Sequence, residues 1–151
     1  NYSVQHWPEP RRGSFAMAGS RTWPGSSKEI HLMNRNDVES LVTRQADAWQ
    51  RADVAAIVAD FSNDGLFISP GGRWQGREAI AATAHEFLAT CSAIRIDIKH
   101  ILCDGDQGAV EWVWHETRKG DGETYTMEDA IIFEIKEGKL IYWREYFEPI
   151  G

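Results

Sequence analysis

Asp129 is the first candidate for a catalytic residue in this chain. It falls in residues 125–136, where apolar and polar side chains alternate and predict a β-strand. The residues that share the apolar face with Asp129 are Met127, Ile131 and Phe133. An ionised carboxylate is costly to bury, so an acid in this row is either a structural hydrogen-bond acceptor or part of a functional site. We favour a site in which desolvation keeps Asp129 protonated near neutral pH, so that it donates a hydrogen bond to a ligand oxygen.

Glu145 is the second acidic candidate, on the final strand of the chain. Alternation along this strand places it on the same apolar face as Phe147. Because Arg144 is its neighbour in sequence, we expect Glu145 to stay ionised and to act as a base. An acid and a base in one cavity suit isomerisation, cyclisation or hydrolysis of a small apolar substrate with one oxygen function. The structural alternative, an ion pair with Arg73 or Arg77 at the rim, stays open.

Tryptophan is unusually frequent, with 7 residues among 151. Trp112, Trp114 and Glu116 alternate along one face of a predicted strand, and we expect Glu116 to be solvated at the mouth of a pocket. With Trp49 they predict an aromatic cage for a flat or alicyclic ligand, and a plain core role is the alternative. The expected pocket lining is Trp49, Phe67, Ser69, Trp74, Trp112, Trp114, Glu116, Met127 and Phe147.

Motifs for metal, nucleotide and serine-hydrolase chemistry are not found in the sequence. His85 and His115 each precede a Glu, but no second His follows at the spacing of the HExxH zinc motif. Residues 104–108 resemble a hairpin turn more than a calcium loop. Glycine-rich phosphate loops and the GxSxG nucleophile turn are also absent from the sequence. We therefore expect neither a metal nor a cofactor.

Charge and cysteine content limit the partners and the compartment. With 23 acidic and 16 basic side chains the net charge is −7, which disfavours binding to nucleic acid or to anionic membranes. No apolar run reaches the roughly 18 residues of a membrane span. Cys91 and Cys103 have no metal-site spacing, and we expect both to be reduced and buried. A cytoplasmic location is the expectation that follows.

Helical patterns occupy the first half of the predicted domain. Apolar residues recur with helical spacing after Asn36, which we expect to be the N-cap, and the pattern points Trp49 inward. A second, short helix is expected to extend its apolar face to Phe61 and to end at Asn63-Asp64-Gly65. The expected elements are helices beginning at Asn36, Asp53 and about Gly76, with the third ending near Ala89 and a short strand from Leu66 to Ser69 before it.

The second half of the chain changes to a period of two, which is typical of strands. Turns at 104–106, 120–122 and 137–138 predict four long antiparallel strands. Helices followed by such strands predict an α+β fold, a cone-shaped barrel whose N-terminal helices pack in the concave face of a curved, mainly antiparallel sheet. We expect residues 1–33 to form an irregular N-terminal arm and residues 34–151 to form this single domain.

The outer face of the predicted sheet carries Val113, Tyr142 and Tyr146. This is a large apolar and aromatic area for the surface of a monomer. We therefore expect a homodimer that covers this face.

The order of elements and the ending Trp143-Arg144-Glu145-Tyr146-Phe147 resemble a known family. They are similar to the SnoaL-like branch of the nuclear transport factor 2-like superfamily, near limonene-1,2-epoxide hydrolase and ketosteroid isomerase. The resemblance covers roughly residues 36–149. It implies a cone-shaped fold with a pocket, and this fold hosts cyclases, isomerases, hydrolases and non-catalytic modules.

The resemblance assigns roles to single residues. Glu145 matches a catalytic Asp of the epoxide hydrolases, whereas Trp112 and Trp114 occupy the positions of their Arg-x-Asp pattern. Asp129 matches the ketosteroid isomerase acid that donates to an oxyanion and the acid/base Asp of SnoaL-type cyclases. Ser69 and Gln45 occupy the positions of the ketosteroid isomerase base and oxyanion Tyr, and neither can do the same chemistry. A non-catalytic ligand-binding or protein-interaction module is therefore the alternative to an acid/base enzyme.

Overall fold

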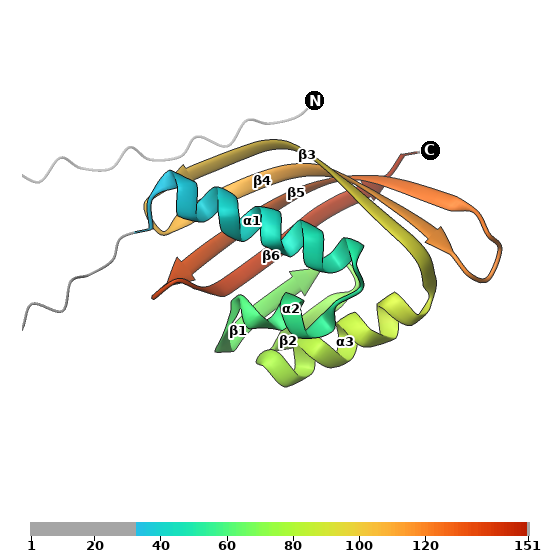
Figure 1. Cartoon of the computed structure of the whole chain (residues 1–151), viewed down its shortest axis with the longest axis horizontal. Coiled ribbons are helices and arrows are strands. Elements are labelled where there is room, and N and C mark those ends of the chain that lie inside the picture. Colours follow the sequence, from blue (N-terminus) through green and yellow to red (C-terminus); the bar gives the residue numbers. More distant parts are fainter. Residues whose placement is uncertain (1–32, 151) are drawn as a thin grey trace, which may run out of the picture.

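The computed structural model describes residues 33–150, so residues 1–32 of the predicted arm and residue 151 lie outside its described part. Three helices and six strands follow one another in the described chain (Figure 1). Their bounds are α1 (Arg35–Gln50), α2 (Val54–Ala59), β1 (Phe61–Ser69), β2 (Gly72–Gln75), α3 (Arg77–Ala89), β3 (Cys91–Asp104), β4 (Gln107–Arg118), β5 (Thr124–Lys136) and β6 (Lys139–Pro149).

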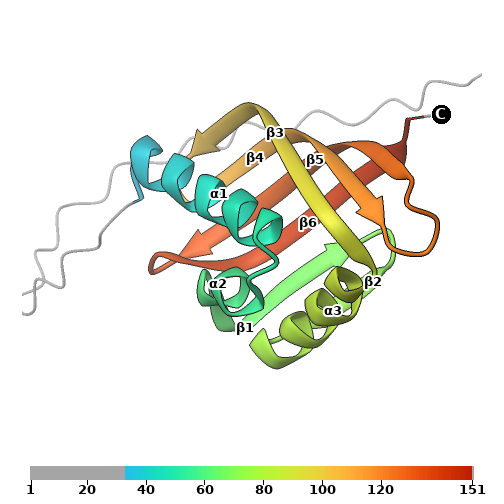
Figure 2. The same cartoon turned by 45° about the vertical axis from the view of Figure 1, so that its right-hand side comes forward.

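The strands form one sheet in the order β2-β1-β6-β5-β4-β3. The pairing of β1 with β6 is parallel and the other pairings are antiparallel. The sheet curves around the helices: α1 crosses its concave face, while α3 lies by β1, β2 and the start of β3 (Figures 1 and 2). These features confirm the α+β fold and the four-stranded antiparallel meander predicted from the sequence.

The first helix begins two residues earlier than the sequence predicts. Asn34 is its N-cap: the Asn34 side chain accepts from the Asp37 amide at 3.0 Å, and the Asp37 carboxylate accepts from the Asn34 amide at 3.3 Å. This reciprocal capping box satisfies two backbone donors of the first turn, so the prediction of Asn36 was wrong. At the other end, Gln50 Oε1 accepts from the Ile96 amide at 2.9 Å and joins α1 to β3.

The predicted end of the second helix was also wrong. Helix α2 ends at Ala59, and Phe61 already belongs to β1. Asp60 explains the change of direction, because its carbonyl accepts from the Leu140 amide at 2.7 Å and brings this segment beside β6. Gly65 lies inside the strand at an irregularity of the β1–β6 pairing, where a Cβ atom would stand 2.9 Å from the Leu140 carbonyl oxygen. A side chain at this position would therefore require the two strands to separate.

Strand β2 was not anticipated, and it determines where Trp74 lies. The turn after Ser69 returns the chain as a short antiparallel partner of β1, with Trp74 directly opposite Phe67. The two ring centroids are 5.7 Å apart. Trp74, which the sequence predicts as a lining residue of the pocket, is thus fixed beside a buried aromatic ring.

The deepest core lies under the strands β4, β5 and β6. Trp112, Phe133 and Trp143 are almost fully buried, and the Trp143 ring centroid is 5.8 Å from that of Trp112 and 5.9 Å from that of Phe133. Burying a large apolar side chain contributes roughly 2–3 kcal/mol to folding. Gly108 is required beside this cluster, because a Cβ atom there would stand 2.4 Å from the Phe133 ring. This packing gives the strands that carry the acidic residues a rigid base.

Candidate functional site

A pocket of about 380 Å³ opens between the helices and the concave face of the sheet. The apolar part of its lining is mostly aromatic and comes from α1, β1, β2, α3, β4, β5 and β6. The apolar lining residues are Trp49, Phe67, Trp74, Ala84, Phe87, Trp114, Met127 and Phe147, with Ser69, Gly71 and Thr83 beside them. A pocket of this size and lining suits a small molecule with rings or branched carbons.

Five aromatic rings form one continuous wall. Trp49 of α1 is at its centre, with ring centroids 5.7 Å from Trp114, 6.4 Å from Phe67 and 6.4 Å from Phe87. Trp74 extends the wall through its contact with Phe67. The rings meet in tilted or edge-to-face arrangements, which aromatic side chains prefer. Such a wall holds its shape without a ligand.

Asp129 projects from β5 into this pocket. It is 4% exposed, and its Oδ2 accepts from Trp112 Nε1 at 3.1 Å on the neighbouring strand. Its other carboxyl oxygen, Oδ1, has no hydrogen-bond partner among the described residues. Burial, followed by the nearby Glu145 carboxylate, raises the pKa of Asp129 from 3.8 to about 8, against the opposite effect of the Trp112 hydrogen bond. This is the direction that the sequence predicts.

Glu145 lies diagonally across from Asp129. It pairs with Ile131 while Asp129 pairs with Phe147, so the two carboxyl groups are on one face of β5 and β6. Glu145 Oε1 accepts from Trp143 Nε1 at 3.1 Å. Burial raises the pKa of Glu145 to about 7, against the opposite effect of the Trp143 hydrogen bond, and the role of Glu145 as a base stays a prediction. The two groups titrate as a pair that retains a proton near neutral pH.

The structure does not contain the rim ion pair that was the alternative role for Glu145. Arg77 instead donates from Nε to the Phe61 carbonyl oxygen at 2.7 Å. None of the ion pairs between described residues involves Glu145 or Arg73. Glu145 therefore faces the pocket without a cationic side chain beside it.

Glu116 differs from the other two acids. It is 2% exposed rather than solvated, with Oε2 accepting from Trp114 Nε1 at 2.9 Å. Both Arg118 Nε and Arg118 Nη2 lie 2.8 Å from its Oε1. The Arg118 guanidinium covers the carboxylate and stacks 3.9 Å above the Tyr125 ring centroid. The solvated mouth predicted for Glu116 was wrong, because a residue two positions along its own strand encloses it.

Each of the three pocket acids accepts a hydrogen bond from the indole N–H of a tryptophan. The pairs are Trp112 with Asp129, Trp114 with Glu116 and Trp143 with Glu145. Two of them join residues two apart on one strand, and that spacing is visible in the sequence as Trp-x-Glu. The high tryptophan content thus reflects polar as well as apolar functions.

Trp112 is the one predicted lining residue that lies elsewhere. It is 0% exposed, packs on Trp143 and reaches the site only through its hydrogen bond to Asp129. Five lining residues were not predicted from the sequence, namely Gly71, Thr83, Ala84, Phe87 and Arg118. Phe87 was detectable as the most voluminous residue on the buried face of α3, whereas the placement of Arg118 depends on its contact with Glu116.

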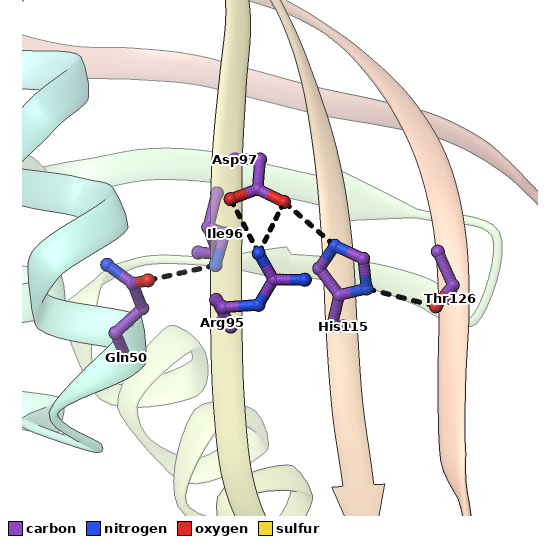
Figure 3. A network of polar contacts seen from close by, with 6 residues as sticks. All are labelled: Gln50, Arg95, Ile96, Asp97, His115 and Thr126. Atoms are coloured by element: carbon purple, nitrogen blue, oxygen red, sulfur yellow. Dashed lines mark hydrogen bonds and ion pairs between the residues drawn. The ribbon is translucent and has the colours of Figure 1, made fainter.

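A second polar cluster lies on the outer face of the sheet (Figure 3). Both Asp97 carboxyl oxygens accept from Arg95 Nη1, at 2.9 and 2.8 Å, and Oδ2 lies 3.0 Å from His115 Nε2. His115 Nδ1 lies 3.0 Å from Thr126 Oγ1. The hydrogen bond from His115, reinforced by the Arg95 charge, lowers the pKa of Asp97 against the opposing effect of desolvation. Every side chain of this cluster has a polar partner.

The remaining candidates carry no site of their own. Within residues 33–150, no group of three His, Cys, Asp or Glu side chains could hold a metal ion. Cys91 is buried and Cys103 half-buried, and neither is in a disulfide. None of the helices in this part of the chain is both long and apolar enough to cross a membrane. Gln45, at the oxyanion position of the resemblance, donates to the Ile57 carbonyl at 2.9 Å and has a structural role.

Comparison with known proteins agrees with this fold. The model of the SnoaL-like domain matches residues 42–143. A protein of Jannaschia sp. CCS1 named as a SnoaL-like polyketide cyclase is 15% identical, with 83% of this chain and 92% of that chain covered and a TM-score of 0.68. An LEH-like epoxide hydrolase of M. tuberculosis is 19% identical over 75% of this chain and 84% of that chain, with a TM-score of 0.66. A protein of Catenulispora acidiphila with a ketosteroid isomerase-like fold, solved in complex with trimethylamine, is 21% identical over 70% and 83%, with a TM-score of 0.66.

Proposed function

Since the chain belongs to the SnoaL-like domain family, we propose that it binds a small apolar molecule in the aromatic pocket and performs cofactor-independent acid/base chemistry on it. The observation that carries this proposal is the pair of carboxyl groups, Asp129 and Glu145, that face one pocket and retain a proton. Perturbed acids in a cleft are typical of catalytic sites. The reaction class is isomerisation, cyclisation or hydrolysis.

The two carboxyl groups have different roles in the proposal. Trp112 fixes Asp129 Oδ2, which leaves Oδ1 to present a proton to an acceptor atom of the ligand. Glu145, the other carboxyl group that lines the pocket, removes a proton from the carbon next to that acceptor. The proton on Asp129 moves to the acceptor as the C–H bond breaks. The proton on the acceptor then returns to Asp129 while Glu145 gives its proton to a carbon atom of the product, which restores both groups. The water-poor aromatic wall strengthens both interactions.

A non-catalytic binding module is the second candidate. Trp112 and Trp114 stand where the resemblance to epoxide hydrolases expects an Arg and an Asp, so hydrolysis by that set of residues is not part of the proposal. A tryptophan wall would bind a ligand equally well without chemistry. The similarity to a ketosteroid isomerase-like protein that binds trimethylamine adds amines to the ligands worth testing alongside ketones and epoxides.

Proton exchange distinguishes the two candidates without knowledge of the natural substrate. Beta-tetralone, a bicyclic ketone, is incubated with the protein in deuterated water, and loss of the protons next to its carbonyl is followed by NMR. We expect the protein to accelerate the exchange, and Asp129→Asn or Glu145→Gln to remove at least about 100-fold of that acceleration. Glu128→Gln, on the same strand but exposed on the opposite face, is the matched control. Binding without acceleration would favour the binding module.

The proposal includes a homodimer formed through the outer face of the sheet. Leu102, Ala109 and Ile132 form one row across β3, β4 and β5, and Leu102 and Ile132 are 65% and 51% exposed. Tyr146 on β6 is 49% exposed nearby. Apolar area of this kind favours a second copy as its cover.

With both cysteines free, we place the protein in the cytoplasm.

A further inference from the structure

The charges that line the pocket do not cancel. Its charged lining residues are Glu116, Arg118, Asp129 and Glu145. Arg118 directs its bonds to Glu116, so this ion pair is neutral as a unit. Asp129 receives the Trp112 indole N–H and a backbone hydrogen bond at Tyr146, and Glu145 receives the Trp143 indole N–H, so none of these donors carries a charge. The lining residues from α1, β1, β2 and α3 carry no charge, so the acidic pair has no counterion in the pocket.

An oxygen atom of this pair also lacks a donor. Asp129 is more than nine-tenths buried and lines the pocket, and its Oδ1 has no partner in the described structure. Buried carboxyl oxygens are almost always hydrogen-bonded. A basic nitrogen would complete the site at this atom, because it accepts the proton of the neutral acid and then donates an N–H to the ionised oxygen.

The aromatic wall favours a positive charge over a neutral group. The faces of aromatic rings are electron-rich, and tryptophan attracts cations most strongly. Trp49, Trp74 and Trp114 all line the pocket, together with Phe67 and Phe87. An anionic ligand would be repelled by the acidic pair, and the net charge of −7 attracts cations to the protein as a whole.

From the uncompensated acidic pair, the unpartnered Asp129 oxygen and the tryptophan wall, we propose that the ligand is a small organic amine, bound as its ammonium ion. This inference rests on the proposed function, because it names the chemical class of the ligand that the aromatic pocket binds. The proton balance is closed within the site. When the free amine enters, the O–H bond of the acidic pair breaks, an N–H bond forms, and the ammonium ion faces two carboxylates.

A quaternary ammonium ion tests the electrostatic part of this inference. It cannot accept the proton of the pair, so its binding must release that proton to solvent. Its affinity should therefore rise with pH as Asp129 and Glu145 ionise, and should level off above the higher of their two pKa values. Glu116 and Arg118 are the other charged groups that face the pocket, and they are bonded to each other rather than to the acidic pair.

The experiment compares three probes of similar shape that share a methoxyphenyl ring. They are the methyl ethers of meta-hydroxyphenyltrimethylammonium, of its neutral carbon isostere meta-tert-butylphenol, and of meta-hydroxyacetophenone as an oxygen acceptor. The methyl ethers have no phenol group to ionise, so the same three compounds serve at both pH values. Their dissociation constants are measured by calorimetry at pH 6 and pH 9. We expect the cation to bind at least about tenfold tighter than its isostere at pH 9, and the preference to shrink at pH 6.

Variants assign the preference to the acidic pair. Asp129→Asn and Glu145→Gln should each remove most of the preference for the cation, whereas Glu128→Gln should keep it. Near-UV circular dichroism checks that each variant is folded, and either of the two pocket variants suffices for the conclusion. Equal or tighter binding of the isostere or the ketone by the wild-type protein would overturn the amine and leave the proposed function standing. Failure of all three probes to bind would contradict the proposed function itself.

Discussion

Asp129 in the pocket and Asp97 on the outer face place the same carboxyl group in opposite environments. Asp97 is surrounded by donors from Arg95 and His115, and its pKa falls. Asp129 has uncharged donors, the Trp112 indole and the Tyr146 backbone, and one unpartnered oxygen, and its pKa rises because burial outweighs these bonds. Both strands have the same period of two, so the face of the sheet and the charge of the partner decide the outcome.

The comparison separates stabilising from functional acids. Charged partners make Asp97 a better acceptor in the folded protein, and its ionised form therefore contributes to stability. Asp129 receives no such compensation, so its ionised form opposes folding. A carboxyl group that lowers the stability of the fold and faces a pocket is better explained by a role in ligand binding than by a structural role. Removing the charge of Asp97 should therefore lower the stability of the fold, whereas removing the carboxyl group of Asp129 should raise it at alkaline pH.

The largest expected effect concerns the support of Asp129 rather than Asp129 itself. Trp112→Ala removes a fully buried ring from its contact with Trp143 and should lower the free energy of unfolding by about 3–5 kcal/mol. Trp114→Ala, in the pocket wall, should cost less stability and enlarge the pocket. Urea unfolding and ligand titration of the two variants measure both effects. Equal losses of stability would show that the pocket wall and the core are not distinct.

The next largest effect is the pH dependence of Asp129→Asn. The pKa of Asp129 is raised in the folded protein, so the folded state holds more protons than the unfolded state and wild-type stability falls between about pH 4 and pH 8. The variant lacks this titration, and at pH 9 it should exceed the wild type by roughly 2–4 kcal/mol. Denaturation at pH 5 and pH 9 tests the sign. A variant less stable than the wild type at pH 9 would mean that ionised Asp129 is stabilised in the fold.

A substitution on the outer face of the sheet should change the oligomeric state of the protein. Ile132→Lys places a charge in the exposed apolar row of the sheet, and we expect it to convert a dimer into a monomer. Glu86→Lys on the exposed side of α3 is the control and should leave the dimer intact. Sedimentation velocity at micromolar concentration reports the mass. A wild-type protein that is monomeric under these conditions would remove the homodimer from the proposal.

The smallest effect is expected for Asp97→Asn. The pKa of Asp97 is lowered, so its contribution is present above the unfolded pKa and is lost as the pH falls through the folded value. The variant should melt slightly below the wild type at pH 7, and the two melting temperatures should converge in acid. Because Asp97 is half-exposed, solvent screens its interactions and the difference stays small. A higher melting temperature of the variant at pH 7 would contradict a stabilising role.

Periodicity predicted much of the fold, but not the contacts that end its elements. The meander from β3 to β6 and the inward face with Asp129 follow from a period of two. The end of α2 depends on Asp60 pairing with β6, which the sequence nearby does not reveal. Alternation also gives the face of a residue but not its depth, so Trp112 and Trp114 looked equivalent although only Trp114 reaches the pocket. Glu116 was misplaced because burial by Arg118 depends on side-chain geometry.

The central claim is that burial beside Glu145 keeps a proton on Asp129 near neutral pH. Carboxyl-carbon NMR of Asp129 over pH 3 to 10 measures this directly, with Asp97 as the internal comparison in the same spectra. The account predicts a midpoint for Asp129 near 8, a lower midpoint in Glu145→Gln because the neighbouring charge is gone, and a midpoint for Asp97 below its ordinary value. A midpoint for Asp129 near its ordinary value of 3.8 in the free protein would contradict the account.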